Sequence, residues 1–243
     1  MTGLQPIQQV ESLEEVEFEI DAENNLQEPN SDYPPENSDE TPLFLASDVL
    51  EFHKFTSNDK LDVILVDYLF EPTTLSFFDC VLDETFIQRI SNALHTPLET
   101  LVIYRCTFAS ENSASMVCSA PAFKGLENFA VANPTLPSLN NWFDAFAEAG
   151  VSLKRFHVDD AVLSVLEIDK DIFLKFFKAQ CEGFILRVEL QNETDVHIMK
   201  ERFEAKFGDH FERNDTVNKQ SPEKYVRFKC DSSLKVTYTL RND

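Results

Sequence analysis

The sequence of 243 residues predicts an α/β fold: a short solenoid of strand and helix units with a mainly parallel sheet, a C-terminal β-hairpin and a disordered acidic N-terminus. Three observations lead to this prediction. A short apolar phrase recurs at nearly even spacing, helical patterns fill most of the intervals, and one end of the chain is acidic without basic residues. One strand, one turn and one helix consume about 20 to 29 residues before the next strand begins.

The recurring phrase is clearest in Leu98–Cys106, which reads L-x-x-L-x-I-x-x-C and follows the leucine-rich-repeat core L-x-x-L-x-L-x-x-N/C-x-L as far as its Cys. Thr74–Cys80 reads x-L-x-F-x-x-C, and weaker copies begin at Leu126, Leu153 and Ile185. The first strand anchors are Leu75, Leu101, Phe129, Phe156 and Val188, which lie 26, 28, 27 and 32 residues apart. A non-repetitive α/β domain is the alternative, because any alternation of strands and helices gives a rough period.

Helical patterns occupy the intervals between these strands. The apolar spacing of Phe86, Ile87, Ile90 and Leu94 predicts an amphipathic helix. A second helix is expected between Ser138 as N-cap and Gly150, where the left-handed conformation ends it. The next starts near Asp169, and the last runs from Thr194 to Gly208. The interval from Cys106 to Gly125 carries the weakest helical pattern.

The two ends of the chain differ in charge and in pattern. Residues 1–53 hold 14 Asp or Glu and no Lys or Arg, out of a net charge of −22 for the whole chain. We expect 1–42 to be a disordered acidic tail, because it lacks the apolar bulk that would offset its ordering entropy. Within it, Val16–Ile20 alternates apolar and acidic residues, either by chance or as a strand that adds to a partner's sheet edge.

Residues 43–243 form the predicted folded domain. Residues 43–60 would be an N-terminal cap, with Leu45, Val49, Leu50 and Phe52 on one helical face, and Leu61–Val66 would be a first strand. Residues 220–243 contain two alternating runs around Asp231–Ser233, which predict a hairpin that caps the last open edge of the sheet.

The composition also limits which cellular compartment and which classes of partner we expect. The five cysteines are far apart, no N-terminal run resembles a signal peptide, and no stretch approaches 18 apolar residues. We therefore expect an intracellular protein, cytoplasmic or nuclear, with reduced thiols and no membrane partner. Basic residues in 194–243 are interleaved with acidic ones, so no nucleic-acid partner is expected.

Motifs for catalysis, metal binding or cofactor binding are missing from the sequence. It has no G-x-G-x-x-G, no G-x-x-x-x-G-K-[ST], no G-x-S-x-G and no H-E-x-x-H. His157 and Asp159 can share one face of a strand while Asp160 turns to the other. This pair is either an acid–base cluster or a polar spot on a binding face, and we favour the second interpretation. We expect no enzyme, no metal site and no cofactor.

The repeat phrases, the Phe-rich helices and the strand Gly183–Leu190, followed by a helix and the hairpin, resemble the leucine-rich-like region of nematode F-box-associated proteins. The resemblance covers about residues 60–243. It implies a domain that selects substrates for a cullin ubiquitin ligase through a protein-binding surface. Leu45–Leu50 is similar to the opening L-P-x-x-V-L of an F-box, but Ala46 replaces the Pro and the rest of an F-box has no room before Leu61.

The predicted function is therefore binding of a partner protein on the concave face of the sheet. In each x-L-x-L-x strand the two apolar residues enter the core and the x positions are exposed. The predicted partner-binding residues are Phe78, Val102, Tyr104, Arg155, His157, Asp159, Arg187 and Glu189. Phe78 and Tyr104 would be exposed aromatic anchors, unless a loop or the tail covers them. An alternative is that the acidic tail itself binds a basic protein, such as a histone or a ribosomal protein.

Overall fold

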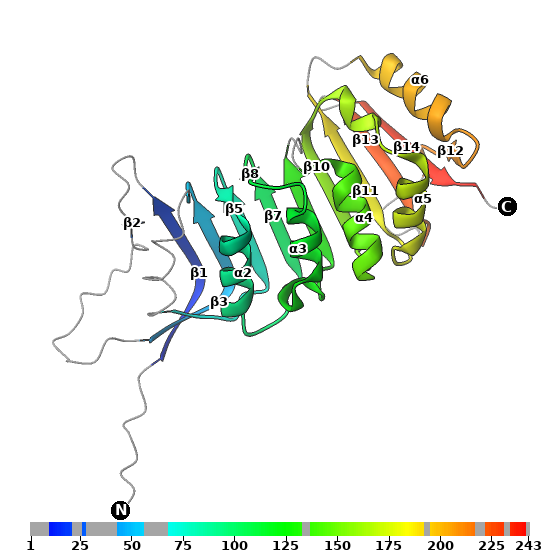
Figure 1. Ribbon diagram of the computed structural model, residues 1–243. Coiled ribbons are helices and arrows are strands. Elements are labelled where there is room, and N and C mark those ends of the chain that lie inside the picture. The colour runs from blue at the N-terminus through cyan, green and yellow to red at the C-terminus, as the bar shows by residue number, and fades with distance from the viewer. Residues whose placement is uncertain are drawn as a thin grey trace, which may run out of the picture.

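The computed structural model describes residues 10–20, 26–27, 43–55, 68–132, 137–191, 195–216, 222–230 and 234–241. They form two layers, a long twisted sheet and a row of helices packed against one side of it (Figure 1). Within these residues, no helix is both long and apolar enough to cross a membrane.

The main sheet is mostly parallel, and its strands follow chain order through most of its width. Its strands are β1 (Val10–Ile20), β2 (Leu26–Gln27), β3 (Leu43–His53), β4 (Tyr68–Phe70), β5 (Thr74–Phe78), β7 (Thr100–Tyr104), β9 (Asn128–Ala132), β10 (Arg155–Ala161), β11 (Ile185–Leu190), β12 (Phe211–Arg213), β13 (Tyr225–Cys230) and β14 (Leu234–Leu240). The parallel run β1-β3-β5-β7-β9-β10-β11-β13 ends in antiparallel β14 and β12. At the other edge β2 is antiparallel to β1, and β4 adds to β3. The expected parallel centre and C-terminal hairpin are confirmed.

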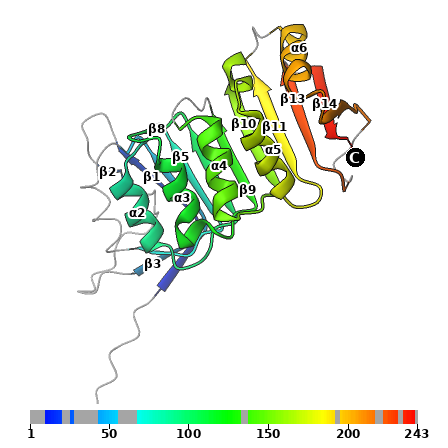
Figure 2. The same cartoon turned by 45° about the vertical axis from the view of Figure 1, so that its right-hand side comes forward.

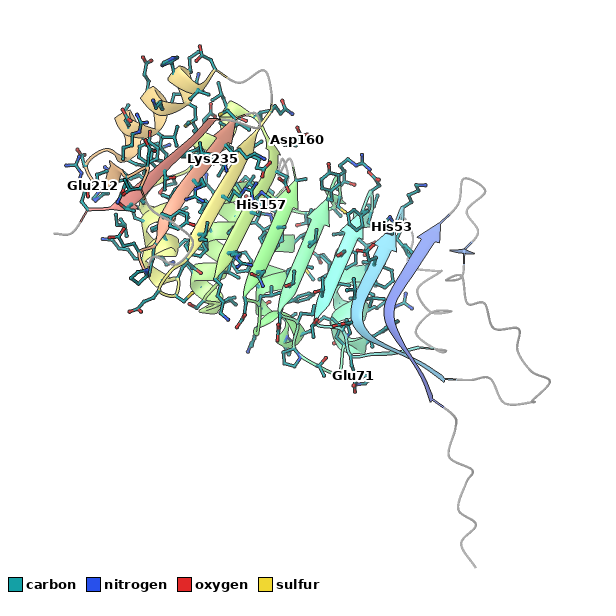
Figure 3. All side chains as sticks on the ribbon, turned by 180° about the vertical axis from the view of Figure 1, so that it is seen from behind. His53, Glu71, His157, Asp160, Glu212 and Lys235 are labelled. Atoms are coloured by element: carbon teal, nitrogen blue, oxygen red, sulfur yellow. The ribbon has the colours of Figure 1, made fainter. Side chains whose placement is uncertain are left out.

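Helices fill the connections between consecutive strands. They are α2 (Glu84–Ala93), α3 (Ser113–Ser119), α4 (Leu139–Ala149), α5 (Lys170–Ala179) and α6 (Val196–Phe207), with 3-10 turns η1 (Pro121–Phe123) and η2 (Leu163–Leu166) and a small parallel pair, β6 (Val81–Leu82) with β8 (Thr107–Phe108). Figures 1 and 2 show α2 to α5 side by side over the same face of the sheet. Figure 3 shows the opposite face of the sheet, on which no helix of the described residues lies.

The helix ends follow from local chemistry, largely as the sequence predicts. Asp83 accepts a hydrogen bond from the Phe86 N–H at 2.7 Å and caps α2. Ser138 caps α4 in a capping box, and Gly150 ends that helix with a φ of 68°. Asp169 caps α5, as expected.

The core lies between the sheet and the helices and is rich in aromatic rings. The predicted anchors on β7, β9 and β10 are all buried: Leu101, Ile103, Phe129, Val131, Phe156 and Val158. Phe156 makes edge contacts with Phe129, Phe143 and Phe146, whose ring centroids lie 4.9 to 5.9 Å away. These ring pairs determine how the strand and helix layers pack against each other.

The same hydrogen-bond pattern recurs at the start of successive strands. The carbonyl of Glu99 accepts the N–H groups of Glu127 and Asn128, and the carbonyl of Glu127 accepts those of Lys154 and Arg155. The carbonyl of Thr73 accepts the equivalent pair before β7 in the same way. Each unit is therefore attached to the one before it by one repeated contact.

A second recurrence lies at the strand ends. Lys54, Asp79 and Arg105 directly follow β3, β5 and β7, and each has a φ between 53° and 61°. The next residue after two of these turns is a cysteine. The Cys80 thiol donates to the carbonyls of Phe52 and Phe78, and the Cys106 thiol to those of Phe77 and Tyr104. Both thiols therefore hydrogen-bond carbonyl groups at the strand ends beside these turns.

The N-terminal part differs from the expectation. The expected helical cap at Leu45–Phe52 is wrong, because Leu43–His53 forms strand β3. Leu50 and Phe52 also fit an alternation of period two, and pairing with β5 decides between the two periods. Val10–Ile20, placed in the expected disordered tail, is strand β1 and pairs with β3 of the same chain. The expected strand Leu61–Val66 lies outside the described residues.

Candidate binding face

The candidate site is the face of the sheet opposite the helices, which we call the open face. It consists of the strand positions that alternate with the core anchors from β3 to β14. Strand register places these positions in rows across the sheet. One row is His53, Phe78, Tyr104, Ala132, Asp159, and the next is Ser76, Val102, Ala130, His157, Arg187, Arg227. The rows bring together residues that are up to 151 positions apart in the chain.

Uncharged side chains form one half of the open face, which we call the apolar half: Phe78, Val102, Tyr104, Ala130 and Ala132 on β5, β7 and β9. The rings of Phe78 and Tyr104 lie 6.1 Å apart, tilted by 49°. His53 on β3 stacks on Phe78 with 4.6 Å between centroids. Both predicted anchors are half-buried, so part of each ring remains exposed.

Charged side chains form the other half, which we call the charged half. Its residues are Arg155, His157, Asp159, Arg187, Glu189, Arg227, Lys229, Lys235 and Glu212, contributed by five strands. Figure 3 labels His157 and Lys235 on it, with Glu212 at its edge. The structure brings four of the predicted residues into one cluster there, and leaves Arg155 exposed at the start of β10.

The centre of the charged half is a network around Glu189. One oxygen of Glu189 contacts the Arg187 guanidinium, and the other lies 3.1 Å from the Lys229 ammonium. The His157 Nε2 atom lies 3.1 Å from Asp159 and 3.4 Å from Glu189. This buried nitrogen has no well-aligned hydrogen bond, so these are short contacts with the two carboxylates rather than directed bonds.

The network changes the acidity of Asp159. Contact with His157 lowers the pKa of the Asp159 carboxyl below its usual value, and the positive charges of Arg187 and Lys229 act in the same direction. Partial burial opposes this shift but does not cancel it. Asp159 is therefore held as a carboxylate, and it offsets positive charge on the open face.

His157, Asp159 and Glu189 place three possible metal-ligand atoms within 4.8 Å of one another. A divalent cation would need the Glu189 oxygens that Arg187 and Lys229 already contact. It would also face two positive groups at short range, which disfavours binding. The residues present fit a charge-balanced network better than a metal site.

Sequence reasoning missed the contributions of β3, β13 and β14 to the face. His53 was assigned to a helical cap, and Lys229, Arg227 and Lys235 to a hairpin that only closes the sheet. The sequence did contain a signal for β13, namely the alternation of apolar and basic residues in Val226–Lys229. Val226 and Phe228 are buried, so Arg227 and Lys229 turn to the open face.

Comparisons with protein-family models, with curated proteins and with solved structures return no match for this chain.

Proposed function

We propose that the protein is a non-enzymatic protein-binding module, and that its partner binds on the open face of the sheet. The observation that carries this proposal is the separation of the two faces. The described helices cover one side, and the other side presents half-buried aromatic rings next to a charged network. Rigid strand positions are well suited to hold such side chains for a partner.

The architecture that we propose for this function is a leucine-rich-like solenoid. The repeated backbone contacts of Thr73, Glu99 and Glu127 support it, as do the recurring left-handed residues after β3, β5 and β7. A solenoid presents equivalent positions of successive units side by side, and this creates a long binding surface from short segments. A substrate-receptor role within a ubiquitin ligase, which the resemblance to F-box-associated proteins implies, is the specific form of this proposal.

Phe78 and Tyr104 are the proposed anchors of the interface. An aromatic ring buries a large area at a low entropic cost, because only two torsion angles become fixed. Alanine at both positions should weaken partner binding by about 2 kcal/mol or more, roughly a 30-fold rise in Kd. The two substitutions should leave the core intact, because neither Phe78 nor Tyr104 is part of the core layer between the sheet and the helices.

The test compares two double variants of the full chain as affinity baits in extract from cells that express it. Phe78→Ala with Tyr104→Ala changes the open face, while Val81→Ala with Ile198→Ala removes two exposed apolar side chains elsewhere. Proteins bound by the wild type and the control pair, but lost by the first pair, are the expected partners. Their Kd values with purified protein then give the predicted 30-fold change. If the first pair keeps all partners, the open face is not the binding site.

A second candidate function follows from the charge of the N-terminal part. Residues 1–53 contain 14 acidic residues and no Lys or Arg, which favours binding of a basic protein. Salt separates the two functions, since binding by a run of exposed charges weakens steeply between 50 and 300 mM salt, while an aromatic interface changes little. Loss of binding after replacement of the acidic residues in 21–40 by Asn or Gln, which leaves strands β1 and β3 unchanged, would favour this candidate if the Phe78 and Tyr104 variants still bind.

A further inference from the structure

The charge of the open face is opposite to that of the molecule. The chain has 43 acidic and 21 basic residues. The charged half of the open face reverses this ratio, with Arg155, Arg187, Arg227, Lys229 and Lys235 against Asp159, Glu189 and Glu212. Positive charge gathered on one face of an acidic protein attracts negative groups to that face and repels them elsewhere.

The basic residues of this half differ in what already neutralises them. Arg187 and Lys229 both contact Glu189, which holds them in place. Arg155 and Lys235 are exposed, and the structure shows no acidic side chain paired with either one among the described residues. They lie on β10 and β14, three strand spacings and four residues apart in register, which corresponds to about 20 Å. They can therefore contact two separate carboxylates of one partner segment.

The apolar half adjoins these charges without a gap. Ala130 pairs in register with Val102 on one side and with His157 on the other, and Ala132 pairs with Asp159. Ala132 is buried and Ala130 is half-buried, so Ala130 forms a low floor one strand wide between Tyr104 and His157. A large apolar side chain on this floor would contact the Tyr104 ring, while its neighbours in the sequence reach the charged half.

We propose that the open face binds an extended segment of a partner protein that has an aromatic or large aliphatic residue next to a run of Asp or Glu. The apolar residue lies on Ala130 beside the Tyr104 ring, and the carboxylates contact Arg155, Arg187 and Lys235. The seven strands from β5 to β14 span about 29 Å, which an extended segment of about nine residues covers. This inference rests on the proposed function and specifies the chemistry of the partner.

The test uses peptides, because the partner is unidentified. A library of random 12-residue peptides displayed on phage is selected on the immobilised full-length chain, and selected peptides are measured in solution by fluorescence anisotropy. We expect sequences with an aromatic or large aliphatic residue flanked by Asp or Glu. Arg155→Glu with Lys235→Glu should raise their Kd about tenfold or more. Lys124→Glu with Lys178→Glu, the same charge change at exposed sites outside the open face, should change it less than about twofold.

Several results would contradict the inference. Peptides without acidic residues, equal effects of the two charge-reversal pairs, or no selected peptide at all would each overturn it. Selected peptides that match the acidic N-terminal part of this chain, together with dimers in analytical ultracentrifugation, would replace the partner by a second copy. Peptides that lack acidic residues but lose affinity with Phe78→Ala and Tyr104→Ala would overturn the acidic-segment inference and leave the proposed function standing.

Discussion

The two faces of the sheet are built from neighbouring residues of the same strands and yet follow different rules. On β7, Ile103 is buried among the helices while Val102 beside it is half-buried on the open face. The covered face tolerates little change, because its aromatic rings are packed against one another from β3 to β14. No described helix packs on the open face, so its side chains do not have to fit a packed aromatic layer. The covered face thus holds the residues that maintain the fold, and the open face holds the proposed binding residues.

The largest expected effect comes from placing the same charge on either face of strand β7. Ile103→Asp would place a carboxylate in the apolar core without a partner, which costs more than about 4 kcal/mol and should unfold the domain. Val102→Asp places the same group on the open face and should change stability by less than about 1 kcal/mol. Urea unfolding followed by circular dichroism measures both. Equal stability of the two variants would contradict the separation of the faces.

A smaller effect is expected at the edge of the helix layer. Gly150 ends α4 with a φ of 68°, and a Cβ there would meet no atom within 4 Å. Gly150→Ala should therefore cost about 1 kcal/mol through backbone strain alone. Gly150→Asn, which tolerates the left-handed region better, should cost less. Thermal unfolding of the two variants checks this order, and a stabilising Gly150→Ala would show that the strain argument fails.

The alternation of strands and helices was predictable because each signal was local. Ser138, Gly150 and Asp169 mark helix ends by their own backbone chemistry, and the anchors of β7 to β10 alternate in the sequence itself. Leu43–His53 was not predictable from its pattern, since its apolar residues fit both helical and strand spacing. Only pairing with β5, far along the chain, decides for a strand.

The site was predictable to the extent that it depends on alternation within a strand. His157, Asp159, Arg187 and Glu189 were expected on one face, and the structure places them in one network. Lys229 could not be placed there from sequence alone. Its contact with Glu189 depends on β13 lying parallel beside β11, a pairing between segments 40 residues apart.

The smallest expected effect concerns the network itself and depends on pH. Because contact with His157 lowers the pKa of Asp159 in the folded state, the folded protein binds this proton less readily than the unfolded chain. The contribution of Asp159 to stability is therefore fully present above the unfolded value of about 4, and it is lost as the pH falls through the lower folded value. The substitution Asp159→Asn removes the contribution of this residue to the pH dependence of stability.

The measurement follows the urea midpoints of the wild type and Asp159→Asn from pH 7 to pH 2.5. The wild type should be the more stable above pH 4, and the difference should shrink as the pH falls below that value. Carboxyl carbon NMR of the wild type should show Asp159 titrating below its usual range. A midpoint at or above about 4 would contradict the contact between His157 and a charged Asp159 in solution.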